Sequence, residues 1–155
     1  MKRLDIKSPD ANNFIGVWNI NDENLCKNMI DFFEQNKNLQ TKGQTASGVN
    51  EEIKKSTDIT IDPVDLKKDG YSVFNDYFKK LNECYIDYKE QYPFLNSFLK
   101  KIHIGHFNVQ KYLAGDHFAR LHSERTSIGT LHRIFAWMTY LNDVDDGGTE
   151  FLYQN

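Results

Sequence analysis

The sequence predicts an α+β fold, with helices in the first part of the chain and a sheet-rich second part. Apolar side chains recur at helical spacing in two long segments before residue 99, whereas the later pattern consists of short extended runs between turn residues. One of the later runs is apolar on both faces, as expected for a strand inside a sheet sandwich. Helices followed by strands favour a β-sandwich or jelly-roll core, on which the helices pack.

The first expected elements are a strand and a helix. Residues 14–18 are apolar and β-prone, and Asn21 or Asp22 can then cap a helix that ends near Asn36. The apolar side chains of this helix are spaced three or four residues apart. Residues 37–50 are polar and lack any period, so a loop is expected there.

A second strand and the longest helix are expected next. Residues 53–61 are rich in β-branched side chains and are followed by Asp62 and Pro63, a pair that disfavours helix. From Asp65 to about Gln91, aromatic and apolar side chains recur every three or four residues. This aromatic stripe predicts a helix face that packs on the sheet.

Three extended runs make up the second part of the chain. They span residues 102–113, 117–122 and 133–142, and the first two are separated by the turn residues 114–116. A hairpin is therefore expected between those two. Residues 133–141 form the run that is apolar on both faces, which places it in the interior of the expected sandwich.

Composition and charge argue against several classes of function. The 155 residues suit one domain, and 19 basic side chains are scattered among 22 acidic ones, for a net charge of −3. No basic stripe indicates binding to nucleic acid. No apolar run is long enough to span a membrane, and residues 1–6 lack the apolar core of a signal peptide. Cys26 and Cys84 fall on apolar helix faces, which is typical of reduced thiols, and a cytoplasmic location is expected.

The histidines gather in the second part of the chain, at positions 103, 106, 117, 122 and 132. His122 and Glu124 carry the clearest chemical signal, because side chains two residues apart on an extended backbone leave the same face. One imidazole and one carboxylate are two of the three ligands in the facial triad of non-haem Fe(II) oxygenases. Alone, the tripeptide His-x-Glu is common by chance. His103, His106 and His117 are expected to be surface or half-buried strand residues.

The His-x-Glu pair stands inside a longer ordered pattern, which covers residues 108–124 and 135–151. The pattern runs from Tyr112 through a glycine-containing turn to His122 and Glu124, and then through Tyr-Leu-Asn to Gly-Gly-x-Thr-x-Phe. With these elements in this order, the chain resembles the prolyl 4-hydroxylase-like oxygenases, which depend on Fe(II) and 2-oxoglutarate.

The resemblance implies a double-stranded β-helix, a form of jelly roll, in which His122 and Glu124 are iron ligands. Glutamate stands where the family more often has aspartate. The resemblance also implies that Tyr112 lines the 2-oxoglutarate pocket and that Tyr140 hydrogen-bonds the distal carboxylate, as phenol donors suit an anion. The turn that follows is matched by Gly147, Gly148 and Thr149.

The family's second histidine ligand and its basic residue for 2-oxoglutarate lie further downstream and have no match here. His132 does not correspond to the distal ligand. We therefore expect a single oxygenase domain that is truncated at its C-terminus, with residues 1–99 mainly helical and residues 100–155 forming the first part of the β-helix core. Such a fragment is expected to have little or no activity by itself.

As the resemblance implies, the expected function is hydroxylation of a C–H bond with Fe(II), 2-oxoglutarate and O2, and with ascorbate as an accessory reductant. The expected substrate is a small molecule or a peptide; peptidyl proline is the family's best-known target, but no residue here selects it. Two alternatives remain open. A non-catalytic jelly-roll binding module would keep the fold without the metal, and a cupin-type metal enzyme would lack the pairing of Tyr112 with Tyr140.

Overall fold

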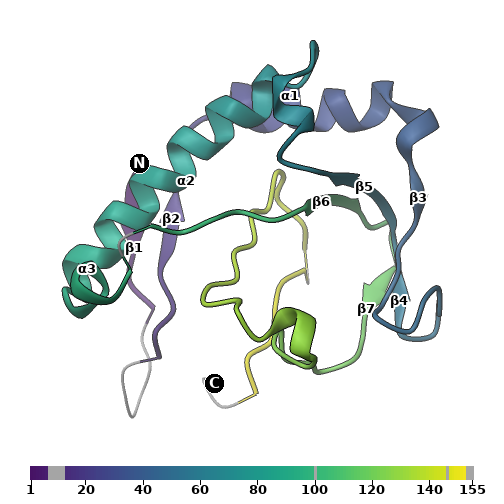
Figure 1. The fold of residues 1–155 in the computed structure, drawn as a ribbon. Coiled ribbons are helices and arrows are strands. Elements are labelled where there is room, and N and C mark those ends of the chain that lie inside the picture. Colours follow the sequence, from purple (N-terminus) through teal and green to yellow (C-terminus); the bar gives the residue numbers. More distant parts are fainter. Residues whose placement is uncertain (7–12, 100, 146, 153–155) are drawn as a thin grey trace.

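The fold is mixed, with helices and small antiparallel sheets (Figure 1). The structure is a computed structural model that describes residues 1–6, 13–99, 101–145 and 147–152. Its α-helices are α1 (Glu23–Gln35), α2 (Ser72–Gln91) and α3 (Phe94–Phe98), and 3-10 turns span Lys37–Leu39, Asp65–Lys67 and Ile128–Thr130. Its strands are β1 (Lys2–Leu4), β2 (Val17–Asn19), β3 (Thr41–Lys42), β4 (Lys54–Lys55), β5 (Thr57–Ile61), β6 (Phe107–Lys111) and β7 (His117–Phe118).

Helix α1 begins and ends where its capping residues predict. The Asp22 carboxylate accepts a hydrogen bond from the backbone N–H of Leu25, and Asn36 ends the helix with its side-chain amide on the carbonyl of Phe32. These contacts satisfy backbone groups that the helix itself leaves unpaired. The expected helix is confirmed, and its buried face carries Leu25, Met29, Phe32 and Phe33.

Helix α2 is shorter than expected at its start. Residues 65–67 form a separate 3-10 turn, and Gly70 has a φ of +87°, a left-handed conformation that interrupts a right-handed helix. The helix therefore begins at Ser72, while its end at Gln91, just before Pro93, agrees with the prediction. None of the helices among the described residues is both long and apolar enough to cross a membrane.

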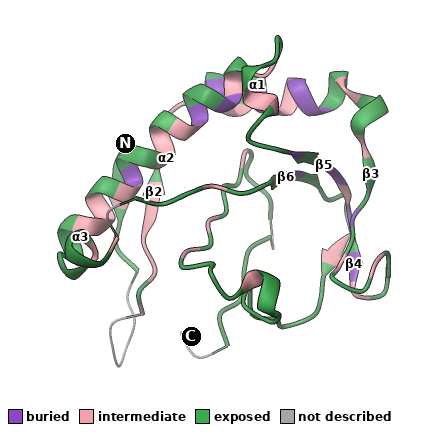
Figure 2. Ribbon diagram, in the orientation of Figure 1, coloured by how far each residue is buried: buried purple, intermediate pink, exposed green. Residues whose placement is uncertain are grey.

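A three-stranded antiparallel sheet with the order β3–β5–β6 carries the core. Ile59 is paired with Val109, and together with Ile61 they face the helices, where Phe74 of α2 is fully buried (Figure 2). The ring of Phe107 lies edge-on to Phe74, with centroids 5.7 Å apart. The predicted packing of the aromatic stripe on the sheet is confirmed for Phe74 and Phe78, whose rings contact Phe107, whereas Tyr85 and Tyr88 contact Phe135 in irregular chain.

A second, two-stranded sheet joins the N-terminus to α2. Strand β2 overlaps the end of the expected strand over residues 14–18 and extends to Asn19, and it pairs with β1, which was not predicted. The indole N–H of Trp18 donates to the carboxylate of Asp87 at 2.7 Å, and Arg3 forms an ion pair with the same carboxylate at 3.1 Å. This three-residue contact fixes the hairpin on the helix.

The second part of the chain has fewer strands than the sequence predicts. The expected hairpin across residues 114–116 is wrong, because β7 pairs with β4 whereas β6 pairs with β5. Strand β7 covers only two residues of the expected 117–122. The expected strand over residues 133–142 is absent, and within the described part of the chain the stretch after β7 contains only a short 3-10 turn.

Residues 133–142 show why a strand does not form there. Phe135 and Trp137 are half-buried against aromatic residues of α2, while Ile134, Met138 and Tyr140 are each more than half exposed. A strand requires a neighbour that satisfies its backbone groups, and no described segment is hydrogen-bonded along this run. The structure shows no closed barrel among its described residues, and the jelly-roll core stays a prediction.

Both cysteines are free thiols. Cys84 is buried on α2 beside the sulfur of Met1, and Cys26 is half-buried on α1. Burial raises the pKa of each thiol, so both favour the protonated, unreactive form.

Candidate functional site

The site is built on the face of the sheet that turns away from the helices. Along β4 and β5 the side chains alternate, so that Ile59 and Ile61 face the core while Lys54, Ser56 and Asp58 face the other way. These three polar side chains are nonetheless buried, with exposures of 3%, 8% and 4%. A buried charged pair on one face of a sheet requires a partner for each charge.

The partners form a small network, which we call the polar network and which consists of Lys54, Ser56, Asp58 and Gln110. The Asp58 carboxylate accepts hydrogen bonds from the Lys54 ammonium at 2.6 Å, the Ser56 hydroxyl at 2.7 Å and the Gln110 amide at 3.1 Å. Gly43 lies against it, where an added Cβ would be only 2.1 Å from the Ser56 hydroxyl. The carboxylate is therefore well satisfied within a closely packed site.

Tyr112 lies at the edge of the polar network. Burial raises the pKa of its phenol, the charge of Asp58 and the nearby Tyr140 raise it further, and a hydrogen bond with Ser56 lowers it. Tyr112 is therefore a neutral donor at physiological pH. Tyr140 contacts the hydroxyl of Thr149, which belongs to the predicted turn.

His122 and Glu124 lie together after β7, outside any strand. The Nε2 atom of His122 is 3.4 Å from Oε1 of Glu124. The Nδ1 atom is 2.9 Å from the carbonyl oxygen of Arg120, which can only accept a hydrogen bond. When Nδ1 donates to that carbonyl in a neutral imidazole, the lone pair of Nε2 is left facing Glu124.

Arg133 occupies the second oxygen of the same carboxylate. Its Nη1 atom is 2.8 Å from Oε2 of Glu124, so that Oε1 alone faces His122. With metal–ligand bonds of about 2.1 Å, two ligand atoms at a right angle are about 3.0 Å apart. The pair therefore fits two neighbouring positions around a divalent cation after a small shift, with the carboxylate binding through one oxygen.

No third ligand joins this pair within the described residues. There, no group of three or more His, Cys, Asp or Glu side chains could hold a metal ion. His103, His106 and His132 are exposed, and both ring nitrogens of His117 approach backbone carbonyls, of Gly115 and Glu52, at 3.3 Å. His122 and Glu124 are the two predicted ligands that the structure brings together.

An aromatic contact connects the pair to the polar network. The ring of Phe118 stacks on the imidazole of His122, with centroids 4.4 Å apart and planes at 16°. The Lys54 ammonium lies 5.7 Å from the centroid of the same Phe118 ring. Neither Lys54 nor Phe118 was predicted to belong to the site. The alternation of polar and β-branched residues from 54 to 61 is the signal that could have indicated that both faces of this stretch carry buried side chains.

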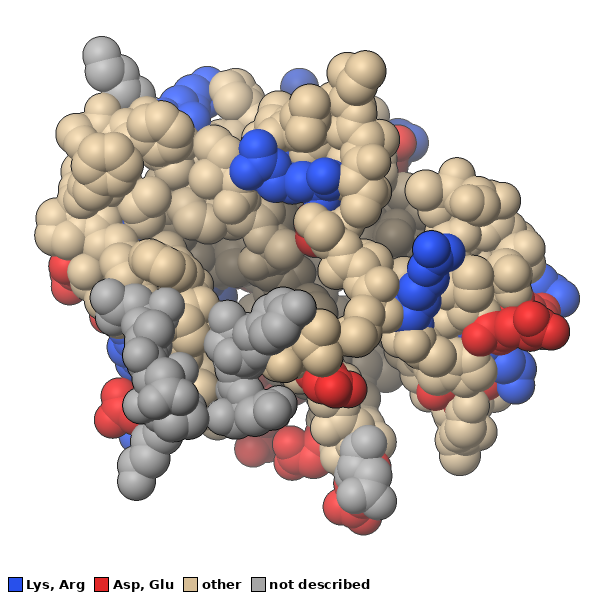
Figure 3. Space-filling model, turned by 90° about the horizontal axis from the view of Figure 1, so that it is seen from below, with Lys and Arg blue, Asp and Glu red and all other residues tan. Residues whose placement is uncertain are grey.

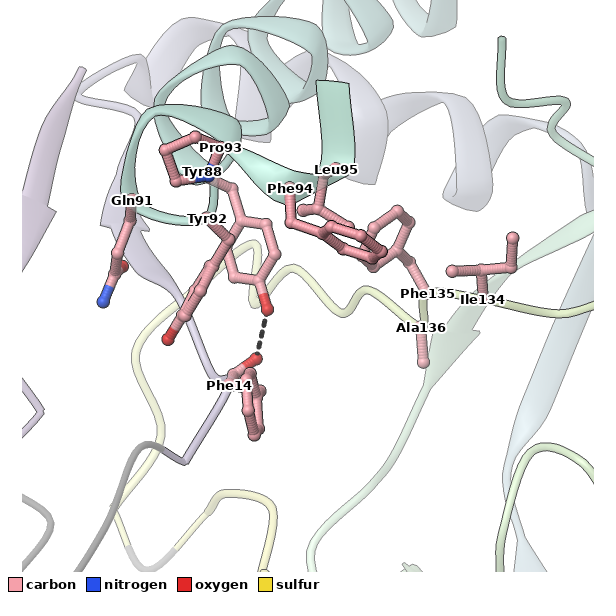
Figure 4. Close-up of a pocket in the computed structure, with 10 residues that line it drawn as sticks. All are labelled: Phe14, Tyr88, Gln91, Tyr92, Pro93, Phe94, Leu95, Ile134, Phe135 and Ala136. Carbon is pink, nitrogen blue, oxygen red and sulfur yellow. Dashed lines mark hydrogen bonds between the residues drawn. The ribbon is translucent and has the colours of Figure 1, made fainter. Parts of the chain in front are cut away.

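A separate groove of about 610 Å³ lies between the end of α2, helix α3 and residues 134–136 (Figure 4). It is lined mainly by aromatic rings, and the phenol of Tyr88 donates to the carbonyl of Phe14 at 2.7 Å. Burial raises the pKa of that phenol. None of the predicted site residues lines this groove.

One face of the molecule shows no strong concentration of one charge among its described residues (Figure 3). Seen from below, the face in Figure 3 carries Lys and Arg side chains interspersed with Asp and Glu, separated by broad uncharged areas. The described residues on this face form no basic stripe of the kind that binds nucleic acid. Comparisons of the chain with protein-family models, with curated proteins and with solved structures find no match.

Proposed function

We propose that this chain carries part of the active site of an Fe(II)- and 2-oxoglutarate-dependent oxygenase. The observation that carries the proposal is the mutual approach of His122 and Glu124, with Nε2 and Oε1 3.4 Å apart. It is supported by the backbone carbonyl that accepts from Nδ1, which leaves Nε2 available to a metal. The resemblance of the surrounding sequence to prolyl 4-hydroxylase-like enzymes supports the choice of iron.

Each residue of the proposed site has one task. His122 and Glu124 bind the cation, and Arg133 orients Glu124 by holding its second oxygen. The family pattern includes a second histidine as the third ligand, and no residue is proposed for that role here. Fe(II) with 2-oxoglutarate supplies the oxidation of a substrate C–H bond by O2, with release of succinate and CO2.

Tyr112 and Tyr140 are proposed to receive the distal carboxylate of 2-oxoglutarate. Both phenols carry an O–H donor, and the raised pKa of Tyr112 keeps that donor protonated. The family pattern also has a basic residue at this carboxylate, and no residue is proposed for that role here. The substrate is proposed to be a small molecule or a peptide, and ascorbate would serve as a reductant.

A second candidate function is a binding module without metal. It is favoured by the contacts of Glu124, whose two oxygens already face His122 and Arg133. A protonated imidazole in this place makes an ordinary ion pair, and no cation is then required. The two functions differ in whether His122 is needed for metal binding.

The test is formation of succinate from 2-oxoglutarate in the presence of Fe(II). It compares the 155-residue chain, the full-length protein encoded by the gene, and full-length His122→Ala, with the exposed His103→Ala as the matched control. We expect turnover by the full-length protein and by His103→Ala, little or none by the 155-residue chain, and none by His122→Ala.

Three results would contradict the proposal or a part of it. Robust turnover by the 155-residue chain would mean that the third ligand is within it, and His132 or His117 would become the candidates. Unchanged turnover by His122→Ala would remove the proposed site altogether. A full-length protein that folds but neither binds Fe(II) nor consumes 2-oxoglutarate would favour the binding module.

A further inference from the structure

Phe118 lies between a buried cation and the proposed metal ligand His122. Its ring stacks almost parallel to the imidazole of His122, with centroids 4.4 Å apart. The Nζ atom of Lys54 lies 5.7 Å from the centroid of the Phe118 ring. Lys54 and Phe118 are also directly opposite each other in the β4–β7 ladder. Cross-strand partners of this kind are held at a fixed separation by the backbone.

Lys54 cannot move freely. It is 97% buried, since its exposure is 3%, and its ammonium is bound by Asp58 at 2.6 Å within the polar network. The ladder is continued by the backbone N–H of Ala119, which donates to the carbonyl of Ile53 at 2.8 Å. The sheet thus holds Phe118 at a defined place.

His122, by contrast, stands in irregular chain and is about two-fifths exposed. Its ring is held by two contacts besides Glu124: the carbonyl of Arg120 at Nδ1 and the face of Phe118. The hydrogen bond between Nδ1 and the Arg120 carbonyl can persist while the imidazole ring rotates about it. The stacked face of Phe118 limits this rotation and so determines where Nε2 points.

We propose that Lys54 and Phe118 are positioning residues that hold the imidazole of His122 in the orientation in which Nε2 faces Oε1 of Glu124. Stacking on Phe118 sets the plane of the His122 imidazole. The buried Lys54 ammonium lies over the Phe118 ring and holds that ring against the sheet. Neither residue touches the metal. This inference rests on the proposed function, since it concerns the same metal ligand.

The test measures Co(II) binding by the full-length protein, with the cation alone as the probe and visible absorption as the readout. Phe118→Leu removes the ring, Phe118→Tyr keeps it, and Phe98→Leu makes the same change at an exposed phenylalanine on α3. We expect Phe118→Leu to weaken Co(II) binding about tenfold and to change the shape of the spectrum, as loss of a supporting contact to a ligand does. Phe118→Tyr and Phe98→Leu should match the parent protein.

Lys54 is tested in the same way with Lys54→Met and Lys54→Arg. The methionine variant removes the charge at similar length and should weaken Co(II) binding. The arginine variant keeps the charge and should bind Co(II) as the parent protein does. If Lys54→Met binds Co(II) with the parent affinity and spectrum, Lys54 has no positioning role.

The outcomes separate this inference from the proposed function. If His122→Ala loses Co(II) binding while Phe118→Leu keeps the parent affinity and spectrum, the positioning role is wrong and the proposed function stands. If His122→Ala binds Co(II) unchanged, the proposed function itself fails. Should Phe118→Leu not fold, the imidazole protons of His122 in the parent protein decide: a stacked ring shifts their NMR signals upfield, and unshifted signals overturn the proposal.

Discussion

The two faces of the three-stranded sheet are filled in different ways. The face toward α1 and α2 is closed by apolar side chains, and Ile59, Ile61 and Phe74 there are essentially without exposure. The opposite face carries the polar network, and the chain beyond β7 on that side has no regular strand among its described residues. One face is held by packing shared among many residues, and the other by a few directional contacts.

This difference indicates a division of tasks. An apolar core resists local change because each of its side chains contacts many others, so that the effect of a small shift spreads through the core. Polar contacts such as those of Asp58 and Glu124 fix particular atoms but stabilise only when every partner is present. We therefore expect substitutions on the helical face to affect folding, and those on the other face to affect geometry as well.

The largest effect is expected from Phe74→Ala. Phe74 is fully buried between the helices and the sheet, and its loss leaves a cavity. The free energy of unfolding should fall by about 3–5 kcal/mol, as measured by denaturant unfolding. Phe94→Ala, at a ring that is 72% exposed, is the matched control and should change stability by less than about 0.5 kcal/mol. Equal losses in the two variants would disprove the assignment of the core.

A somewhat smaller loss is expected from Asp58→Ala on the polar face. The substitution leaves the Lys54 ammonium buried without its counter-charge, which should lower the free energy of unfolding by about 3 kcal/mol. The double variant Lys54→Met/Asp58→Leu removes both charges and should recover most of this loss. If the double variant is as unstable as Asp58→Ala, the cost does not arise from an unpaired charge.

Gly43→Ala tests how closely the polar network is packed. A Cβ at this position would lie 2.1 Å from the Ser56 hydroxyl and 3.0 Å from the Lys54 side chain, so the network must move to admit it. We expect a loss of about 1–3 kcal/mol by denaturant unfolding. Gly105→Ala, where nothing lies within 4 Å, should be close to neutral. A neutral Gly43→Ala would show that the network is loosely held.

The smallest effect is a change in the pH dependence of stability. The Lys55 ammonium, and after it the backbone N–H of Leu113, lower the pKa of Asp116. A lowered folded-state pKa stabilises the fold above the unfolded value of about 3.9, and this contribution is lost as the pH falls through the folded value. The stability difference between the parent protein and Asp116→Asn should therefore be constant near neutral pH and shrink below about pH 4. A difference that does not vary with pH would contradict this pairing.

Local signals made the helices predictable. The end residues of α1 follow from Asp22 and Asn36, whose side chains bond neighbouring backbone groups without help from the rest of the fold. The predicted start of α2 is too early because the 3-10 turn at residues 65–67 keeps helical spacing, and because a hydrophobic pattern does not show the left-handed conformation of Gly70.

Contacts between distant segments explain what the sequence did not reveal. The strand expected over residues 133–142 depends on a ladder partner, and an apolar pattern does not identify one. Burial of Lys54 and Asp58 could not be expected from residues that are usually exposed. By contrast, the approach of His122 to Glu124 needed only a spacing of two residues, which is why the candidate pair could be named in advance while Phe118 could not.

The two tryptophans lie in different regions of the molecule, so their fluorescence can report on each region separately. Trp18 is tied to Asp87 in the N-terminal hairpin, while Trp137 lies edge-on to Phe78 at 6.5 Å from within the irregular chain. Since these are the only tryptophans in the sequence, replacing either one by phenylalanine leaves a single tryptophan, whose emission is distinct from that of the tyrosines, in a known region. The emission of the two single-tryptophan variants would show whether the β1–β2 hairpin and the irregular chain around Trp137 unfold together or in separate steps.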